Sequence, residues 1–227
     1  MKTPEHADGY ALRESWRLFR IISEFVEGFD VLPAVAPAVT VFGSARCDAD
    51  SDLYRSAYEI GRRLGEAGFS VITGGGPGVM EAANKGALEA GAHSVGLNVE
   101  IPLEERPNGY TTTALTFRYF FVRKVMLVKY ATAFVLLPGG YGTLDEMFET
   151  LTLIQTGRIG TFPVILFGSS YWGGLVAWLR EQVRAQGYCG PDDLEIFHVT
   201  DDPEEVVRIV REWHKAHGTP VDNLRGA

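Results

Sequence analysis

The chain has 227 residues, of which 46% are hydrophobic, and it carries a formal net charge of -8 with a pI near 5.2. This length and composition suit one domain with a substantial core, and the negative charge argues against nucleic acid or an anionic membrane as the main partner. Cys47 and Cys189 have no metal-type spacing and no disulfide framework, and the sequence has neither a signal-peptide pattern nor a membrane-length apolar run. We therefore expect a single-domain cytoplasmic protein.

The first predicted element is an amphipathic helix over residues 12–32, which we expect to pack on the domain. Pro33 and Pro37 end this helix before a short apolar strand that finishes at Gly43 and Ser44. We expect residues 1–36 to form a helical extension, residues 37–217 the main domain and residues 218–227 a flexible tail.

Strands and helices alternate through the rest of the chain. Apolar runs typical of strands buried on both faces occur at 70–73, 94–99, 113–117, 133–138, 162–167 and 194–199. Helical periodicity occurs at 51–68, 79–91, 118–131, 143–157, 171–186 and 203–217. This alternation predicts an α/β fold, a Rossmann-like doubly wound parallel sheet flanked by helices, with any ligand at the carboxyl ends of the strands.

Two of the predicted strands run into dense glycine. The first run is VITGGGPG and the second is VLLPGGYG, with glycines at Gly74, Gly75, Gly76 and Gly78 and at Gly139, Gly140 and Gly142. Glycine lets backbone N–H groups approach a ligand closely, and a helix N-terminus favours negative charge. A tight turn alone explains one short run, but two runs at the same sheet edge favour an anion site, most naturally for phosphate.

Neither glycine run matches a standard nucleotide fingerprint. The sequence contains no G-x-x-x-x-G-K-[ST], which argues against an ATP-hydrolysing P-loop. Gly76-Pro77-Gly78 and Gly140-Tyr141-Gly142 lack the later glycine of G-x-G-x-x-G, so a standard dinucleotide site loses its main support.

The segment after the second glycine run has two interpretations. Thr143 to Glu146 reads T-x-x-E, which is typical of a capping box in which Thr143 caps the helix and Glu146 reaches back to it. If phosphate occupies the backbone donors instead, Glu146 lies on the ligand side with Thr143 and Thr150. The core-facing positions are then Leu144, Phe148 and Leu151.

A basic pair, Arg123-Lys124, lies inside the strongly apolar segment RYFFVRKVMLVKYA. A cation in a buried helix needs a partner, so Arg123 either forms a structural ion pair or faces an anionic substrate. The segment has more apolar surface than one helix can bury on a single sheet, and the first helix adds another apolar face. We therefore expect a homodimer or a larger even homo-oligomer, with the Arg123 helix near the interface. The five histidines show no ligand spacing, and we expect no metal site.

These residues carry a resemblance to a known family. The chain resembles the Lonely guy family of cytokinin-activating phosphoribohydrolases, whose members are often mislabelled lysine decarboxylases. The diagnostic motif is P-G-G-x-G-T-x-x-E, here Pro138 to Glu146, and the GGG loop and the Arg-Lys pair support it. The similarity runs from about Thr40 to about Val210.

The resemblance implies hydrolysis of the N-glycosidic bond of a nucleoside 5'-monophosphate, giving a free base and ribose 5-phosphate. AMP is the expected substrate, and cleavage of N6-substituted cytokinin riboside monophosphates stays open. Glu146 and Arg123 would be the catalytic pair. The substrate-binding residues would be Gly43, Ser44, Gly74, Gly75, Gly76, Met80, Lys124, Gly139, Gly140, Gly142 and Thr143.

The sequence departs from the compact plant-type members of the family. Phe121 and Val122 stand where those members tend to have a histidine and an acid, the first glycine loop is one residue shorter, and an N-terminal helix is added. These features fit a longer bacterial-type branch, and they leave the preference for N6-prenyl groups undecided.

Two other functions compete with hydrolysis. A related protein could hold a nucleotide or a nucleotide-bearing cofactor without cleaving it, which the glycine loops alone do not exclude. Pyridoxal-phosphate-dependent lysine decarboxylation needs a Schiff-base lysine, and Lys85, Lys124 and Lys129 have no such context. We expect no cofactor.

Overall fold

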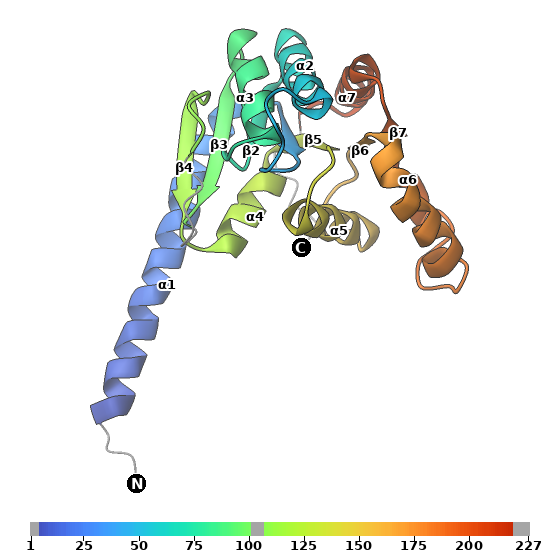
Figure 1. Cartoon of the computed structure of the whole chain (residues 1–227). Coiled ribbons are helices and arrows are strands. Elements are labelled where there is room, and N and C mark those ends of the chain that lie inside the picture. The colour runs from blue at the N-terminus through green and yellow to red at the C-terminus, as the bar shows by residue number, and fades with distance from the viewer. Residues whose placement is uncertain (1–4, 101–106, 220–227) are drawn as a thin grey trace.

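The computed structural model describes residues 5–100 and 107–219, and its centre is one parallel sheet (Figure 1). The strand order is β4-β3-β2-β1-β5-β6-β7, and every pair of neighbours is parallel. This order confirms the predicted Rossmann-like doubly wound sheet. The strands are β1 (Ala38–Phe42), β2 (Ser70–Thr73), β3 (Ser94–Val99), β4 (Thr113–Phe117), β5 (Ala131–Leu136), β6 (Val164–Phe167) and β7 (Phe197–Thr200).

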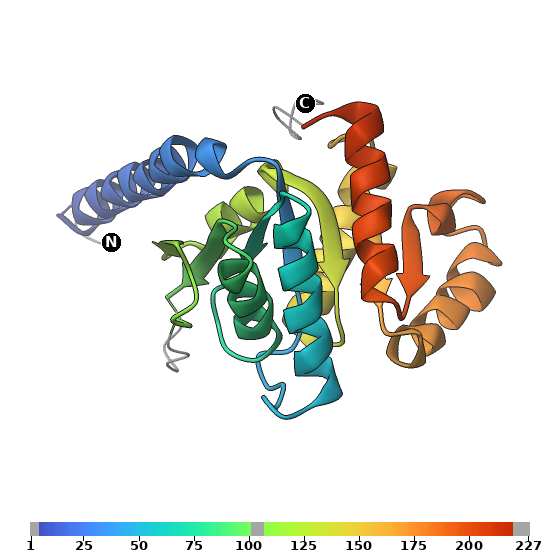
Figure 2. The same cartoon turned by 90° about the horizontal axis from the view of Figure 1, so that it is seen from above.

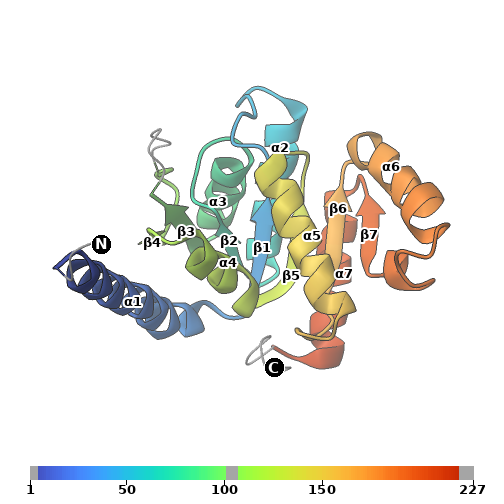
Figure 3. The same cartoon turned by 90° about the horizontal axis from the view of Figure 1, so that it is seen from below.

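Helices cover both faces of the sheet. Figure 2 shows one face, under α2 (Asp52–Glu66), α3 (Val79–Glu89) and α7 (Pro203–His217). Figure 3 shows the other, under α4 (Phe120–Lys129), α5 (Tyr141–Gln155) and α6 (Ser169–Trp178). Each face has its own apolar core, because the strand side chains alternate between the two helical layers.

The strand order reverses between β1 and β5, the neighbours at the centre of the sheet. The chain winds outward from β1 through β2 and β3 to β4, then returns to the other side of β1 with β5. The loops that leave β1 and β5 therefore diverge at their carboxyl ends, where doubly wound folds bind their ligands. One backbone bond, from Ser44 N–H to the Pro138 carbonyl at 3.0 Å, joins these two loops.

The expectation that the first helix packs on the domain is wrong for most of its length. Helix α1 (Glu5–Val31) extends away from the sheet, and only its last turns approach α4 (Figure 1). Trp16 is 62% exposed and Phe19 is 63% exposed, because the sheet offers no apolar surface that far out. The short 3₁₀ helix that follows, Leu32–Val35, anchors the chain through two buried side chains, Leu32 and Val35. Most of the predicted tail, residues 220–227, lies outside the described residues.

Several strand and helix predictions need correction at their ends. The outer strands β4 and β7 are not buried on both faces, since each lies at a sheet edge where helices cover it incompletely. Residues 194–196 do not belong to β7, because a 3₁₀ turn (Asp193–Glu195) precedes the strand. The helix predicted over 171–186 is α6 followed by a π-helical turn, Leu179–Arg184.

Candidate functional site

A cavity of about 620 Å³ lies at the carboxyl ends of the central strands. It collects residues from the loops after β1, β2 and β5, from the end of β3, and from helices α3, α4 and α5. Ten of the thirteen residues predicted as site residues line it: Gly43, Ser44, Gly74, Gly76, Met80, Arg123, Gly140, Gly142, Thr143 and Glu146. The structure does not place Gly75, Gly139 or Lys124 on its lining.

The second glycine run forms the N-terminus of α5. The helix begins at Tyr141 with Gly140 as its N-cap, and no side chain caps its first N–H groups. A Cβ added to Gly140 or Gly142 would meet no protein atom within 4 Å, so the space beside this helix end is open. Uncapped N–H groups and the positive end of the helix dipole together suit an anion such as phosphate.

The helix start decides between the two interpretations of Glu146. Thr143 is the third residue of α5 and not its cap, so Thr143 and Glu146 cannot form the predicted capping box. Glu146 lies one turn further in and is only 3% exposed, and its Oε2 atom has no hydrogen-bond partner. A buried carboxylate oxygen without a partner is costly, which is typical of a group that serves a ligand. Thr150 is also fully buried on this side, whereas Phe148, predicted to face the core, is 39% exposed.

Arg123 faces the same cavity from α4. Its guanidinium lies over the Phe120 ring at 4.7 Å, and Nη1 donates to the Leu97 carbonyl at 3.5 Å, while Nε is buried without a partner. Burial lowers the pKa of Arg123, and the charges of Glu146 and Asp145 oppose that effect. Neither Arg123 nor Glu146 satisfies its hydrogen-bonding capacity within the described part of the chain.

Burial raises the pKa of Glu146 to about 7. The charge of Lys124 works in the opposite direction, Glu149 raises the pKa further, and Arg123 lowers it. A carboxyl group with a pKa near neutrality is well matched to proton transfer at physiological pH.

Lys124 is directed away from the cavity despite its position next to Arg123. Its ammonium group pairs with Asp145 at 2.7 Å and also with Glu149, both on α5. Partial burial disfavours its charge, but these two carboxylates raise its pKa overall. Lys124 therefore joins α4 to α5 behind the catalytic candidates, and it acts on Glu146 only through its charge.

The first glycine run is packed against protein atoms. A Cβ on Gly75 would lie 2.3 Å from Asn98 Oδ1, and one on Gly78 would lie 2.4 Å from the Ser44 carbonyl oxygen. Both glycines have positive φ, 72° and 68° respectively, which a residue with a side chain rarely adopts. These two glycines are required by the protein's own packing.

A buried amide network holds this loop from behind. Asn84, fully buried on α3, accepts hydrogen bonds from Thr73 Oγ1 at 2.6 Å and Asn108 Nδ2 at 3.0 Å. It donates to Ser94 Oγ at 2.8 Å. Asn108 in turn donates its backbone N–H to Gly75 and its side chain to Gly76, at 2.8 and 3.0 Å. The network fixes the loop from its far side and leaves its near side to the cavity.

Sequence reasoning missed several residues that line the cavity. Arg46, in the loop after β1, presents an exposed guanidinium that makes no ion pair or side-chain hydrogen bond with the described residues. Its backbone N–H bonds to Ser44 Oγ at 3.1 Å, which orients the loop. The run FGSAR, which ends a predicted strand, was the available signal. The other missed residues are Phe42, Ala45, Asn98, Val99, Phe120, Leu127, Tyr141 and Leu144.

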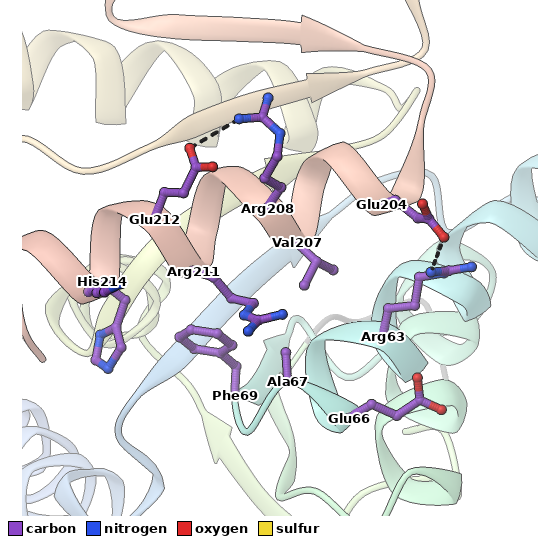
Figure 4. Close-up of a pocket in the computed structure, with 11 residues that line it drawn as sticks. Arg63, Glu66, Ala67, Phe69, Glu204, Val207, Arg208, Arg211, Glu212 and His214 are labelled. Atoms are coloured by element: carbon purple, nitrogen blue, oxygen red, sulfur yellow. Dashed lines mark hydrogen bonds and ion pairs between the residues drawn. The ribbon is translucent and has the colours of Figure 1, made fainter.

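A second groove, of about 830 Å³, lies between α2 and α7 (Figure 4). Phe69, which immediately precedes β2, contributes to its lining, so it opens at the amino ends of the strands. Ion pairs cross or flank it, with Arg63 bonded to Glu204 and Arg208 to Glu212. Its described lining residues include no glycine-rich loop and none of the predicted site residues, and we assign the functional site to the smaller cavity.

Among residues 5–100 and 107–219, no three His, Cys, Asp or Glu side chains gather in a way that could hold a metal ion. None of the described helices combines the length and apolar character that crossing a bilayer requires.

Comparison with known proteins identifies the family. A family model described as possible lysine decarboxylase matches residues 80–210. LOG3 of Arabidopsis thaliana, a cytokinin riboside 5'-monophosphate phosphoribohydrolase, is 27% identical over 182 residues, covering 79% of this chain and 84% of the relative. The probable enzyme LOG4 of Oryza sativa subsp. japonica is 30% identical over 172 residues, covering 74% of each.

The chain belongs to the Lonely guy family. Solved structures share its fold: a structural-genomics target, TM1055, is 27% identical with a TM-score of 0.58 and covers 77% of this chain and 98% of that one. The molybdenum cofactor carrier protein of Chlamydomonas rheinhardtii is 21% identical with a TM-score of 0.59 and covers 79% and 98%. The segment from Pro138 to Glu146 forms the turn into α5 and its first turns, and it borders the cavity.

Proposed function

We propose that the protein hydrolyses the N-glycosidic bond of nucleoside 5'-monophosphates, with AMP as the reference substrate. The observation that carries the proposal is the buried Glu146 carboxylate, with one oxygen unpartnered, one turn inside a helix whose uncapped N-terminus borders the same cavity. The names of the curated relatives, which are phosphoribohydrolases, support the same reaction.

The two ends of the cavity suit different parts of a nucleotide. The N–H groups at the start of α5 and the guanidinium of Arg46 would bind the 5'-phosphate, with Thr143 close to the ribose. Glu146 would then face the ribose carbon that carries the base. This arrangement places the carboxylate where positive charge develops as the bond to the base breaks.

The chemical step uses one water molecule. The C1'–N bond breaks with its electron pair going to the base, and an oxocarbenium-like sugar forms beside Glu146. The carboxylate stabilises that charge and takes a proton from the water whose oxygen bonds to C1'. The departing base takes up one proton, which balances the proton that Glu146 removes from the water. Arg123, which shares the cavity, would hold the nucleotide in place and keep Glu146 ionised.

Hydrolysis is tested by incubating the protein with AMP and with adenosine. We expect adenine and ribose 5-phosphate from AMP and no cleavage of adenosine, because the phosphate contributes most of the binding energy. Equal rates for the two compounds would contradict the phosphate site. AMP binding without cleavage would favour the competing function, a non-catalytic nucleotide or nucleotide-cofactor binder of the same fold.

The residues present do not fit pyridoxal phosphate chemistry. That cofactor needs a lysine for its Schiff base, and no lysine occurs among the described residues that line the cavity. Lys124, the nearest candidate in sequence, is bound by Asp145 and Glu149. We derive no decarboxylation from this site.

A homodimer or larger even assembly is part of the proposal. Phe120 and Phe121 on α4 are 46% and 48% exposed, and Phe148 on α5 is also exposed. The exposed apolar stripe of α1, which includes Trp16 and Phe19, adds to this surface. Apolar area of this extent is rarely left in water.

Light scattering tests the assembly. We expect a mass at least twice the 25.0 kDa of one chain. Replacing Phe121 and Phe148 with serine should lower that mass, whereas Tyr188→Ser, at an exposed position in another loop, should leave it unchanged. A wild-type mass of one chain at micromolar concentration would refute the assembly.

A further inference from the structure

The turn that precedes α5 is held by its carbonyl groups. The Ser44 N–H, in the loop after β1, donates to the Pro138 carbonyl at 3.0 Å, and the Tyr171 hydroxyl, on α6, donates to the Gly139 carbonyl at 2.5 Å. The N–H of Gly140, a residue that lines the cavity, has no acceptor among the described residues. The protein therefore occupies the acceptors of this turn and leaves a donor beside the cavity.

The orientation of that donor depends on one peptide group, between Gly139 and Gly140. The peptide is planar and trans, so its carbonyl and its N–H point in opposite directions. The carbonyl is fixed toward Tyr171, which does not line the cavity, so the Gly140 N–H is directed to the other side, toward the cavity. This N–H adjoins the uncapped N-terminus of α5, where the 5'-phosphate is proposed to bind.

Glycine on both sides makes this peptide easy to turn over. A Cβ on Gly140 would meet no protein atom within 4 Å, and a Cβ on Gly139 would lie 2.2 Å from Thr143 Oγ1, so neither residue has a side chain that restrains the backbone. A peptide that rotates by half a turn would present its carbonyl oxygen to the phosphate and repel it. The hydrogen bond from Tyr171 opposes that rotation.

The first turn of α6 holds Tyr171 in place. Helix α6 begins at Ser169, whose N–H donates to the carboxylate of Asp201 at 2.7 Å, just after β7. The fully buried Trp172 donates its Nε1–H to the Leu136 carbonyl at 3.2 Å, which ties the helix to the end of β5. The Tyr171 ring packs edge-to-face on the Trp172 ring, with 4.8 Å between centroids. Two neighbouring strands therefore position the helix that carries the hydroxyl.

We infer that Tyr171 is a positioning residue for the phosphate, because its hydroxyl fixes the Gly139–Gly140 peptide with the Gly140 N–H toward that group. This inference rests on the proposed function and adds to it a residue outside the cavity. The Tyr171 side chain acts only through the backbone of the turn. Its loss should weaken the binding of ligands that carry the phosphate and leave the chemical step at C1' in place.

The test is Tyr171→Phe, which removes the hydroxyl and keeps the ring beside Trp172. We expect the dissociation constant of ribose 5-phosphate, measured by calorimetry, to rise about 5- to 20-fold, the size expected for one hydrogen bond. The KM for AMP should rise by a similar factor, while kcat changes by less than about threefold. The phosphorus NMR resonance of ribose 5-phosphate at saturation should also move relative to wild type, because the phosphate loses a donor.

Tyr188→Phe is the matched control. Tyr188 is 74% exposed in the loop after the π-helical turn, so this variant should leave the dissociation constant, KM and the phosphorus resonance unchanged. Thermal melting separates positioning from general damage to the fold. Tyr171→Phe should lower the melting temperature by no more than about 4 °C, the shift that one hydrogen bond accounts for in a chain of this length.

Three results would overturn the inference. One is a dissociation constant for ribose 5-phosphate that stays within about twofold of wild type. Another is a kcat that falls while KM and the dissociation constant stay constant, since Tyr171 would then act on the chemical step. The third is a much larger fall in melting temperature with an equal loss of kcat and binding, which would assign Tyr171 to the fold alone.

Failure of hydrolysis itself would be a separate result, because binding of ribose 5-phosphate needs no turnover. A protein that cleaves nothing but binds ribose 5-phosphate with an affinity that depends on Tyr171 supports the inference and contradicts the hydrolase. An active enzyme whose affinity does not depend on Tyr171 does the reverse. A wild-type protein that does not bind ribose 5-phosphate overturns both.

Discussion

The two glycine runs differ in what occupies the space that a side chain would fill. At Gly75 and Gly78 that space holds the Asn98 carboxamide and the Ser44 carbonyl, and both residues have positive φ. At Gly140 and Gly142 it holds no protein atom within 4 Å, and φ is negative at both. The first run is glycine because the fold requires it. In the second run Gly139 is also required by packing, since a Cβ there would lie 2.2 Å from Thr143 Oγ1. Gly140 and Gly142 have no such constraint, and a bound ligand supplies a reason for them.

The largest expected effect comes from the carboxylate that follows the open run. Glu146→Gln keeps the size of the side chain but removes its charge, so we expect AMP hydrolysis to fall by at least about a hundredfold while AMP still binds. The melting temperature should not fall, because Glu146 caps nothing and its buried charge costs stability. Steady-state kinetics and thermal melting measure both.

Asp145→Asn is the matched control, because Asp145 is exposed and does not line the cavity. It should reduce the rate far less than Glu146→Gln does. A Glu146→Gln protein with more than about a third of the wild-type rate would remove Glu146 from the chemistry and weaken the contrast between the two runs.

A reciprocal pair of glycine substitutions sharpens the contrast directly. Gly142→Leu adds a side chain to open space, so we expect an unchanged melting temperature and a KM for AMP raised by at least about tenfold. Gly78→Ala forces a side chain into positive φ against the Ser44 carbonyl, which should cost about 3 kcal/mol or more of folding free energy. Denaturant unfolding measures the stability of both variants, and steady-state kinetics measure their KM for AMP. An equal loss of stability in the two variants would show that the two glycine runs do not differ in what the fold requires.

A smaller effect is expected on the pH dependence of hydrolysis, which Lys124 influences through its charge. Because burial raises the pKa of Glu146 to about 7, kcat/KM for AMP should rise with pH through that value as the carboxylate forms. Lys124→Met removes a charge that lowers this pKa, so the midpoint should move to higher pH, with a loss of a few-fold at pH 7 that is recovered near pH 9. Lys215→Met, in the groove between α2 and α7, should leave the profile in place.

Ionisation of Glu146 also lowers the stability of the folded chain as pH rises. The pKa of Glu146 is higher in the folded chain than its ordinary value of 4.5, so the folded state holds the proton more tightly. Its contribution to stability is complete below about pH 4.5 and is lost as pH rises through about 7, at most about 3 kcal/mol. The melting temperature of Glu146→Gln relative to wild type should therefore rise between pH 5 and pH 8, and a constant difference would contradict this assignment.

Much of the fold was accessible from the sequence because apolar runs and helical periodicity alternate so regularly. The cavity residues beside glycine were accessible too, since dense glycine before a helix has few explanations. The start of α5 could not be predicted from the sequence. The T-x-x-E pattern predicts a cap at Thr143, but the helix begins earlier, at Tyr141, with Gly140 as its N-cap. Asn98 looked like an ordinary strand residue, because its place on the cavity lining depends on how the end of β3 packs beside the loop that follows β2.

Sequence reasoning also failed where a residue's environment depends on distant packing. Lys124 and Arg123 are neighbours in one apolar helix, and only the position of Asp145 and Glu149 on α5 turns the first away from the cavity. The exposure of α1 and Phe148 has the same cause, since periodicity shows that a face is apolar but not which surface covers it.

The pairing of β1 with β5 sets an order of events during synthesis. Ala38 pairs with Ala131, so one edge of β1 has no partner until more than ninety further residues have been made. At about 5–20 residues per second that interval lasts on the order of 5–20 s, during which an apolar strand edge stays open. Both the loop of Arg46 and the turn of Glu146 flank that seam. A nascent chain that stalls before β5 therefore has no site at all, and it presents the edge on which chaperones or aggregation can act.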